Sequence, residues 1–409
     1  MESALPGSSL KMSMNPSDLI PVQGRKAGAL TFGLLFLLES LVRSFNSGVL
    51  SIQAYDLLGS SQNVSILTTS ISLCVLITTL FMPLLFAHMR RRWVYTIGGL
   101  AMILGSMALA SYTLPGQVVG VLLRNSGASI MNVALQLYIL DHIRKADLTS
   151  SEPTRLALST VAWVVGPFSG VWLYEHYGPI APQLAAMAAA TLVLAVFWYL
   201  RLHDKVNLPS GTVQPFNPIT NAARFISQPR LRLAWAIAFG RSCFWATFFT
   251  YGPILMIEGG LGKQAGGYII SGSQLFLLTA FFFGASAKRF GVRRVIASCF
   301  SVIAVATCAA GIFGVSSPNA SAACLLVAAF FASGVDSVGG IPYLRSVKPN
   351  ERQRMTAVYR TFIECSELIP GLVFAAALSF FDVSVVFVIL GICLSSLALL
   401  TWRYLPKSM

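Results

Sequence analysis

Long apolar windows recur along the chain and are separated by short polar segments. A helical window of about 20 apolar residues crosses a hydrocarbon core about 30 Å thick. The windows predict twelve spanning helices near residues 28–52, 64–86, 94–113, 117–140, 156–176, 181–200, 233–256, 266–287, 292–314, 321–344, 356–380 and 383–404. We therefore expect an all-α integral membrane protein that crosses the bilayer many times.

The polar segments differ in charge on the two sides of this arrangement. Lys and Arg gather in the tails and in alternate loops, as in the Arg90, Arg91, Arg92 cluster, whereas the opposite loops hold only Lys263. Cytoplasmic loops retain basic residues, so both termini are predicted to be cytoplasmic. Topology then accounts for the net charge of +14, which makes a nucleic-acid partner unnecessary. We expect a monomer in a lipid bilayer, the bacterial inner (plasma) membrane.

Composition excludes several other classes of protein. With 55% hydrophobic and 11% charged residues, the chain has too little polar cover for a soluble fold. The polar segment through Lys26 leads directly into a full-length span, so no removable signal peptide is expected. The seven cysteines form no CxxC pair and no Cys/His cluster, and no nucleotide-binding loop or nucleophile–base set occurs. These patterns predict no metal, no cofactor and no enzyme activity.

The chain divides into two halves. We expect a cytoplasmic tail at 1–26, a six-helix bundle at 27–201, a linker at 202–232 and a second six-helix bundle at 233–409. Within the Pro-rich linker, NPITNAARFIS fits either an amphipathic helix with Phe225 and Ile226 toward lipid or a coil. A basic loop after the second span of the first half recurs 201 residues later in the second half. Such duplication is typical of transporters that bind substrate near the midplane between repeats.

The two basic loops carry a resemblance to the major facilitator superfamily. That family's loop signature matches Gly284, Lys288, Arg289, Gly291 and Arg293 in the second half, and Arg91 and Arg92 in the first. Both copies lack the family's acidic residue, and the first copy also lacks its glycines. The resemblance covers the whole chain and implies two six-helix halves around a central cavity, with these loop residues helping to control the conformational change.

A second match lies in the fifth predicted span. Gly166, Pro167 and Gly170 fit the Gly-Pro-x-x-Gly core of the family's antiporter signature, without its preceding spaced glycines. A Gly-Pro pair removes a backbone hydrogen bond and lets a neighbouring helix approach, which produces a bend. The segment is therefore either a conformational element of an antiporter or a packing kink. In the fourth span, Arg124 and Gly127 partly match another family signature.

Eight ionisable residues fall at membrane depth. They are four acids and four arginines: Glu39, Arg43, Arg124, Arg241, Asp336, Arg360, Glu364 and Glu367. An unpaired charge at the bilayer centre costs at least about 2.5 kcal/mol, so these side chains should face the bundle interior. Glu39 precedes Arg43 by four residues, which favours an intrahelical pair, and Arg360, Glu364 and Glu367 should share one helical face. Each pair is either part of a solvated central site or a self-neutralised packing pair.

These residues divide into two predicted roles. A proton-coupled carrier needs an acid that changes protonation, and we favour Glu364 or Glu367, then Asp336, with Glu39 and Arg360 as coupling partners. Arginines recognise carboxylate or phosphate through paired hydrogen bonds. The predicted substrate site is Arg43, Asn46, Arg124, Asn132, Gln136, Arg241, Trp245 and Tyr251.

The leading hypothesis is a proton-coupled secondary transporter that exports a small polar or zwitterionic organic compound. Mixed arginines, carboxylates and aromatics suit such a molecule better than a lipophilic cation. A proton symporter that imports an organic anion or metal chelate is the first alternative, favoured by the four arginines. A non-transporting membrane receptor with the same fold is the second.

Overall fold

The computed structural model describes residues 29–142, 148–200, 218–347, 355 and 358–406. The regular structure in these ranges is helical, with no strand. Its first part contains α1 (Ala29–Phe45), α2 (Val49–Leu58), α3 (Ser61–His88), α4 (Arg91–Ala110), α5 (Leu114–His142), α6 (Leu148–Tyr177) and α7 (Ile180–Tyr199). Its second part contains α8 (Pro218–Ile226), α9 (Pro229–Glu258), α10 (Lys263–Leu275), η2 (Phe276–Thr279), α11 (Ala280–Phe290), α12 (Val292–Phe313), η3 (Gly314–Ser316), α13 (Pro318–Val338), α14 (Ile341–Ser346), α16 (Phe362–Ala377) and α17 (Ser384–Tyr404).

The helices agree with a multi-pass membrane protein. Each predicted span coincides with one helix or with consecutive helices, and nine segments of the described chain are long and apolar enough to cross a membrane. The ranges 156–176, 233–256 and 356–380 fall on α6, α9 and α16, which are outside those nine. The all-α membrane architecture is confirmed, while the number twelve remains a prediction.

Two predicted spans are broken in the structure. The first span is predicted from the sequence to be one helix over 28–52. In the structure α1 ends at Phe45, residues 46–48 form a turn, and α2 continues as far as Leu58. Asn and Ser favour turns because their side chains can hydrogen-bond to nearby backbone groups, and Gly favours them because it lacks a Cβ and adopts more backbone conformations. The tenth span breaks at Gly339 and Gly340, just before α14, because two glycines and Pro342 weaken helix continuation.

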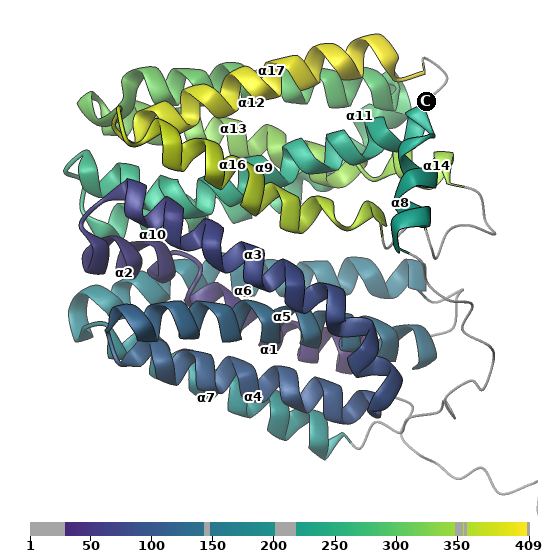
Figure 1. The fold of residues 1–409 in the computed structure, drawn as a ribbon. Helices are drawn as coiled ribbons and strands as arrows, with labels where there is room; N and C mark the ends of the chain where they lie inside the picture. Colours follow the sequence, from purple (N-terminus) through teal and green to yellow (C-terminus); the bar gives the residue numbers. More distant parts are fainter. Residues whose placement is uncertain (1–28, 143–147, 201–217, 348–354, 356–357, 407–409) are drawn as a thin grey trace, which may run out of the picture.

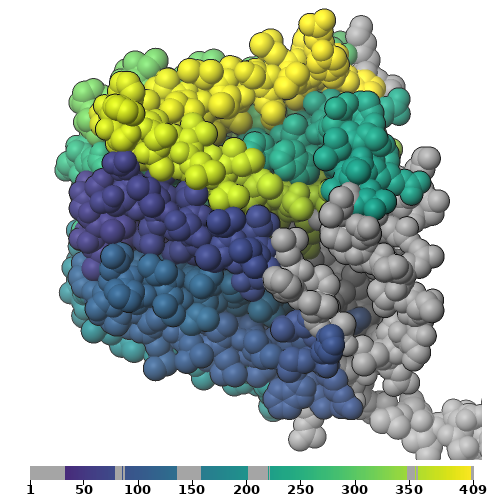
Figure 2. Space-filling view, viewed as in Figure 1, coloured from purple at the N-terminus to yellow at the C-terminus, as the bar shows by residue number. Residues whose placement is uncertain are grey.

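Helices of the first and second halves occupy different parts of the molecule. In Figure 1 the purple and blue helices lie below the green and yellow ones, apart from α10, which reaches down beside α2. Buried residues such as Tyr95 and Met131 form one apolar cluster, and Phe244, Phe300 and Phe387 belong to another. The halves meet where α3 packs on α16 and α6 packs on α10. Figure 2 shows the purple surface of α3 against the yellow-green surface of α16.

The two ends of the bundle carry different elements. One end, which we call the basic end, holds α8, α14 and the C-terminus, and the far end holds α2 and the start of α10 at Lys263 (Figure 1). Helix α8 corrects an expectation, because Phe225 is buried with Leu231 and Tyr343 instead of facing lipid. Ile226 is exposed. The short helix is thus anchored on α9 and α14.

Candidate functional site

A central cavity of about 200 Å³ lies between the two halves. Its wall comes from α2, α3 and α5 on one side and from α9 and α16 on the other. The lining residues are Ser47, Leu50, Ser51, Ala54, Leu67, Thr68, Ile71, Ser72, Gln117, Val121, Asn125, Ala246, Thr247, Phe249, Thr250, Tyr251, Ser366, Glu367, Pro370, Gly371 and Phe374. Hydroxyl and amide groups alternate with aliphatic and aromatic surface, as expected of a site for a small organic molecule.

Glu367 connects the two halves at this cavity. Its Oε2 accepts a hydrogen bond from the Ser72 hydroxyl at 3.0 Å, which joins α16 to α3. One turn further along α16, the Gly371 carbonyl accepts a hydrogen bond from Ser65 at 2.9 Å. The Tyr251 hydroxyl of α9 donates to Ser65 at 2.6 Å. Because Glu367 lines the cavity and also bonds to the opposite half, a ligand or proton on its carboxylate would affect the hydrogen bond between the halves.

The charges of the first half form a separate group in α1 and α5. Glu39 is fully buried, and its Oε1 lies 3.9 Å from Arg43 Nη2. Arg124 is nearly buried and donates to the Arg43 carbonyl at 2.5 Å. The Arg43 guanidinium lies 6.0 Å from the ring centroid of Trp163 in α6. This group lies near the end of α1, before the turn that leads to the cavity wall.

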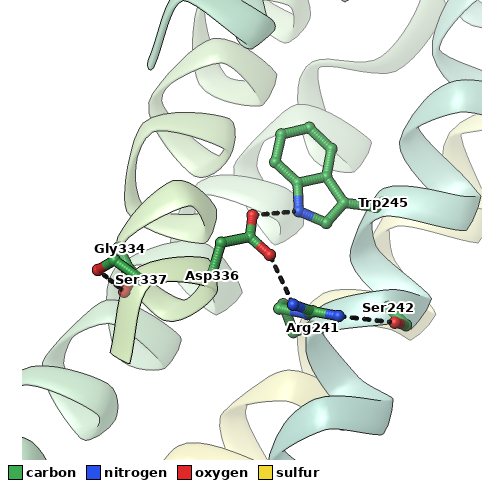
Figure 3. A network of polar contacts seen from close by, with 6 residues as sticks. All are labelled: Arg241, Ser242, Trp245, Gly334, Asp336 and Ser337. Atoms are coloured by element: carbon green, nitrogen blue, oxygen red, sulfur yellow. Dashed lines mark hydrogen bonds and ion pairs between the residues drawn. The ribbon is translucent and has the colours of Figure 1, made fainter. Parts of the chain in front are cut away.

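Two charges of the second half, Arg241 and Asp336, form a compact ion pair (Figure 3). Asp336 of α13 lies 2.8 Å from Arg241 of α9, and its other oxygen accepts a hydrogen bond from the Trp245 indole at 2.9 Å. Arg241 also donates to Ser242 at 3.4 Å and lies 5.5 Å from the centroid of the Phe362 ring. Three predicted residues from two helices are thus brought together.

The remaining predicted binding residues are spread over several places. Asn46 is fully buried in the turn after α1, and neither atom of its amide has a hydrogen-bond partner in the described chain. Asn132 is half-buried in α5. Gln136 lies in the same helix, with its side chain outside the described part. Arg360 lies in the turn that leads directly into α16, Glu364 lies in the first turn of that helix, and Glu367 lies one turn further along.

The Gly-Pro-x-x-Gly segment of α6 packs against the end of α1. A Cβ on Gly166 would overlap the Ser44 hydroxyl, and one on Gly170 would overlap the Phe45 carbonyl. The glycines therefore permit an approach between backbones that a side chain would prevent. Pro167 lies between them within the helix. The segment thus packs beside the α1–α2 break.

The basic loops lie at the junctions of α3 with α4 and of α11 with α12. Arg91 and Arg92 begin α4. In the second half, Arg289 lies in the last turn of α11, and Gly291 has a φ of +89°, a backbone conformation that favours glycine. Arg293 lies 5.1 Å from the centroid of the Trp402 ring. Gly284 has open space where a Cβ would stand, so packing does not require it.

Sequence reasoning missed two contacts between the halves. Ser65, Thr69 and Ser72 form a stripe on α3, and a Cβ on Gly371 would overlap the Thr69 hydroxyl. Small residues at a spacing of three and four were the available signal. At the far end, Asp56 of α2 lies 2.6 Å from Lys263 of α10 and accepts a hydrogen bond from Tyr174 at 2.7 Å.

Comparisons with known proteins agree with this architecture. The family model described as Major Facilitator Superfamily matches residues 32–277 and 260–408. No curated protein sequence matches the chain.

Similar solved structures include several transporters. One is a POT family transporter in complex with 5-aminolevulinic acid, with a TM-score of 0.75 and 11% identity over 93% of this chain and 96% of that one. Another is a POT family transporter in complex with a thioalcohol conjugated peptide, with a TM-score of 0.75 and 12% identity over 90% and 94% of the two chains. The nucleoside transporter NupG has a TM-score of 0.69 and 12% identity over 92% and 99%. At these identities the likeness concerns the fold.

Proposed function

Because the chain belongs to the major facilitator superfamily of secondary transporters, we propose that it is a proton-coupled antiporter that exports a small polar organic compound. The observation that carries this proposal is the Glu367 carboxylate. It lines a cavity between the halves and accepts a hydrogen bond from Ser72 on the opposite half. A proton or a substrate on this carboxylate would weaken the Ser72 bond, and an alternating-access cycle needs such a dependence.

Export is supported by the match of Gly166, Pro167 and Gly170 to the core of the family's antiporter signature, while the contacts between the halves describe one state of the transport cycle. The hydrogen bonds that link α3 to α16 and α2 to α9, together with the Asp56–Lys263 ion pair, lie toward the far end. If the basic end is cytoplasmic, these contacts lie toward the outer side, and the cycle must break them when the cavity opens outward. The packing of Gly166 and Gly170 on α1 supports a bend beside the same cavity.

The kind of substrate follows from the size and lining of the cavity. About 200 Å³ is smaller than the roughly 300–1,000 Å³ of sites for drug-sized ligands. The similar solved structures include complexes with 5-aminolevulinic acid and with a conjugated peptide, which supports a small organic compound as the substrate. The second candidate is a proton symporter that imports an organic anion. It is favoured by Arg43 and Arg241, which are about a quarter exposed and can offer guanidinium groups to an anion.

The test is transport in proteoliposomes with an imposed pH gradient. We expect proton flux that depends on an added organic compound and runs opposite to it, and we expect Glu367→Gln to abolish that coupling. Glu175→Gln, an exposed carboxylate near the end of α6, is the matched control and should retain coupling. Flux of proton and compound in the same direction would establish the symporter instead. Unchanged coupling in Glu367→Gln would remove this residue from the mechanism.

A further inference from the structure

The central cavity has an uneven distribution of charge. Among its described lining residues, Glu367 carries the only acidic side chain, and no Lys or Arg is present. Arg43, Arg124, Arg241 and Arg360, which suggested an anionic substrate, all lie outside the lining. Arg241 is engaged by Asp336, and Arg124 by the Arg43 carbonyl. The lining itself therefore presents one carboxylate and otherwise neutral groups.

The carboxylate has capacity for a further donor. Ser72 occupies Oε2, and no donor among the described residues is recorded for Oε1. Glu367 is exposed, and because it lines the cavity a ligand placed there can reach it. An ionised carboxylate accepts several hydrogen bonds, and those from a cationic donor are the strongest. A protonated amine supplies both the charge and the donors.

The rest of the wall defines the body of such a ligand. Phe249 and Phe374 contribute aromatic surface, and Leu67 and Ile71 contribute aliphatic surface from the opposite half. Phe374 is held in place by an edge contact with Tyr251, at 5.5 Å between ring centroids. Gln117, Asn125 and the hydroxyl residues can orient a second polar group. The volume limits the ligand to a compact molecule.

We infer that the central cavity binds a compact organic amine in its protonated form, with the ammonium group on Glu367 and the apolar body against Phe249 and Phe374. This inference rests on the proposed transport function and names its substrate class. The ammonium group binds the carboxylate beside Ser72 and draws charge away from the oxygen to which Ser72 donates, so binding weakens a bond between α3 and α16. Occupancy of the cavity thereby loosens one contact between the halves.

The test is equilibrium binding to the purified full-length protein at neutral pH. Three probes of similar size are compared: 2-phenylethylamine, 2-phenylethanol and 3-phenylpropanoate. We expect the amine to bind at least tenfold more tightly than the alcohol or the acid. This series uses the unaltered protein, so it does not depend on how a variant folds. Equal binding of the three probes, or tighter binding of the acid, would overturn the inference.

Variants then locate the ammonium site. Charge-assisted hydrogen bonds contribute about 1.5–3 kcal/mol, so Glu367→Gln should weaken amine binding by about 10- to 150-fold and leave alcohol binding nearly unchanged. Glu175→Gln, the matched control outside the cavity, should bind the amine like the unaltered protein. Loss of amine preference in Glu175→Gln, or its retention in Glu367→Gln, would overturn the assignment of the ammonium group to Glu367.

The transport assay separates this inference from the proposed function. Proton-coupled exchange of another compound, without preference for amines in the binding series, would overturn the inference and leave the antiporter standing. Amine binding that needs Glu367, with no proton-driven movement of the amine, would support the inference and overturn the antiporter.

Discussion

Two glycines predicted to aid the conformational change differ in what surrounds them. A Cβ on Gly170 would overlap the Phe45 carbonyl, while one on Gly284 would meet open space. We expect Gly170→Ala to destabilise the protein by about 1–3 kcal/mol through overpacking, and to reduce transport. Gly284→Ala should be neutral or stabilising by up to about 1 kcal/mol, because Ala favours helix. Thermal unfolding of both variants in detergent measures the difference, and equal melting temperatures would contradict it.

The Arg241–Asp336 pair can be tested as a unit. Asp336→Asn should lower stability because Arg241 keeps its charge and loses its partner in a partly buried position. Removing both charges in Arg241→Gln/Asp336→Asn should restore part of the loss. A double-mutant cycle should give a coupling energy on the order of 1–3 kcal/mol. Strictly additive effects in thermal unfolding would show that the ion pair contributes little.

At the scale of helices, the contact of α2 with α10 should help to hold the far end closed. The Asp56–Lys263 ion pair is partly exposed, at 18% and 33%, so its expected contribution is about 1 kcal/mol. Lys263→Gln should therefore increase the open population about fivefold. The measurement is labelling of Ser51→Cys, a cavity position, by a bulky impermeant thiol reagent applied from the far-end side, after Cys74 and Cys393 are replaced by Ser.

The control for this experiment is a lysine at the other end of the molecule. Lys288→Gln removes an exposed charge from α11 near the basic end and should leave the labelling rate unchanged. An equal rise in both variants would mean that net charge is responsible. No rise in Lys263→Gln would mean that the helix contacts alone keep the far end closed.

The positions of helices could be predicted from sequence, whereas their rotation against one another could not. Hydropathy identified the ranges because a 20-residue apolar segment has few alternatives in a membrane. It did not reveal the α1–α2 break at 46–48, because the Asn-Ser-Gly turn signal is short and lies within a long apolar window. A Cβ on Gly48 would meet Val171 of the first half and Ile270 of the second, and such proximity depends on tertiary packing.

The sequence pointed to the charged and aromatic residues of the candidate site but not to the hydroxyl residues that bond across the halves. Arg241, Trp245 and Asp336 converge as a group, and Glu367 and Tyr251 both line the cavity. Ser72 and Ser65 were missed because a hydroxyl on an apolar helix usually bonds to its own backbone, and only the facing helix shows that these two bond across the halves. Ionisable residues within a membrane span can be identified as candidate site residues from sequence, whereas the role of a neutral hydroxyl becomes visible only when the facing helix is known.

For the whole molecule, the basic end should face the cytoplasm. The segments at this end include the α3–α4 and α11–α12 junctions with their arginines, and the far end carries Lys263. Arginine-rich loops are retained on the cytoplasmic side during insertion. An impermeant reagent outside the cell should therefore reach the far end and should not reach the basic end. In a variant without Cys74 and Cys393, Lys263→Cys should react with an impermeant thiol reagent in intact cells, and Arg289→Cys only after the membrane is permeabilised. The reverse result would place the basic end outside and would contradict the predicted orientation.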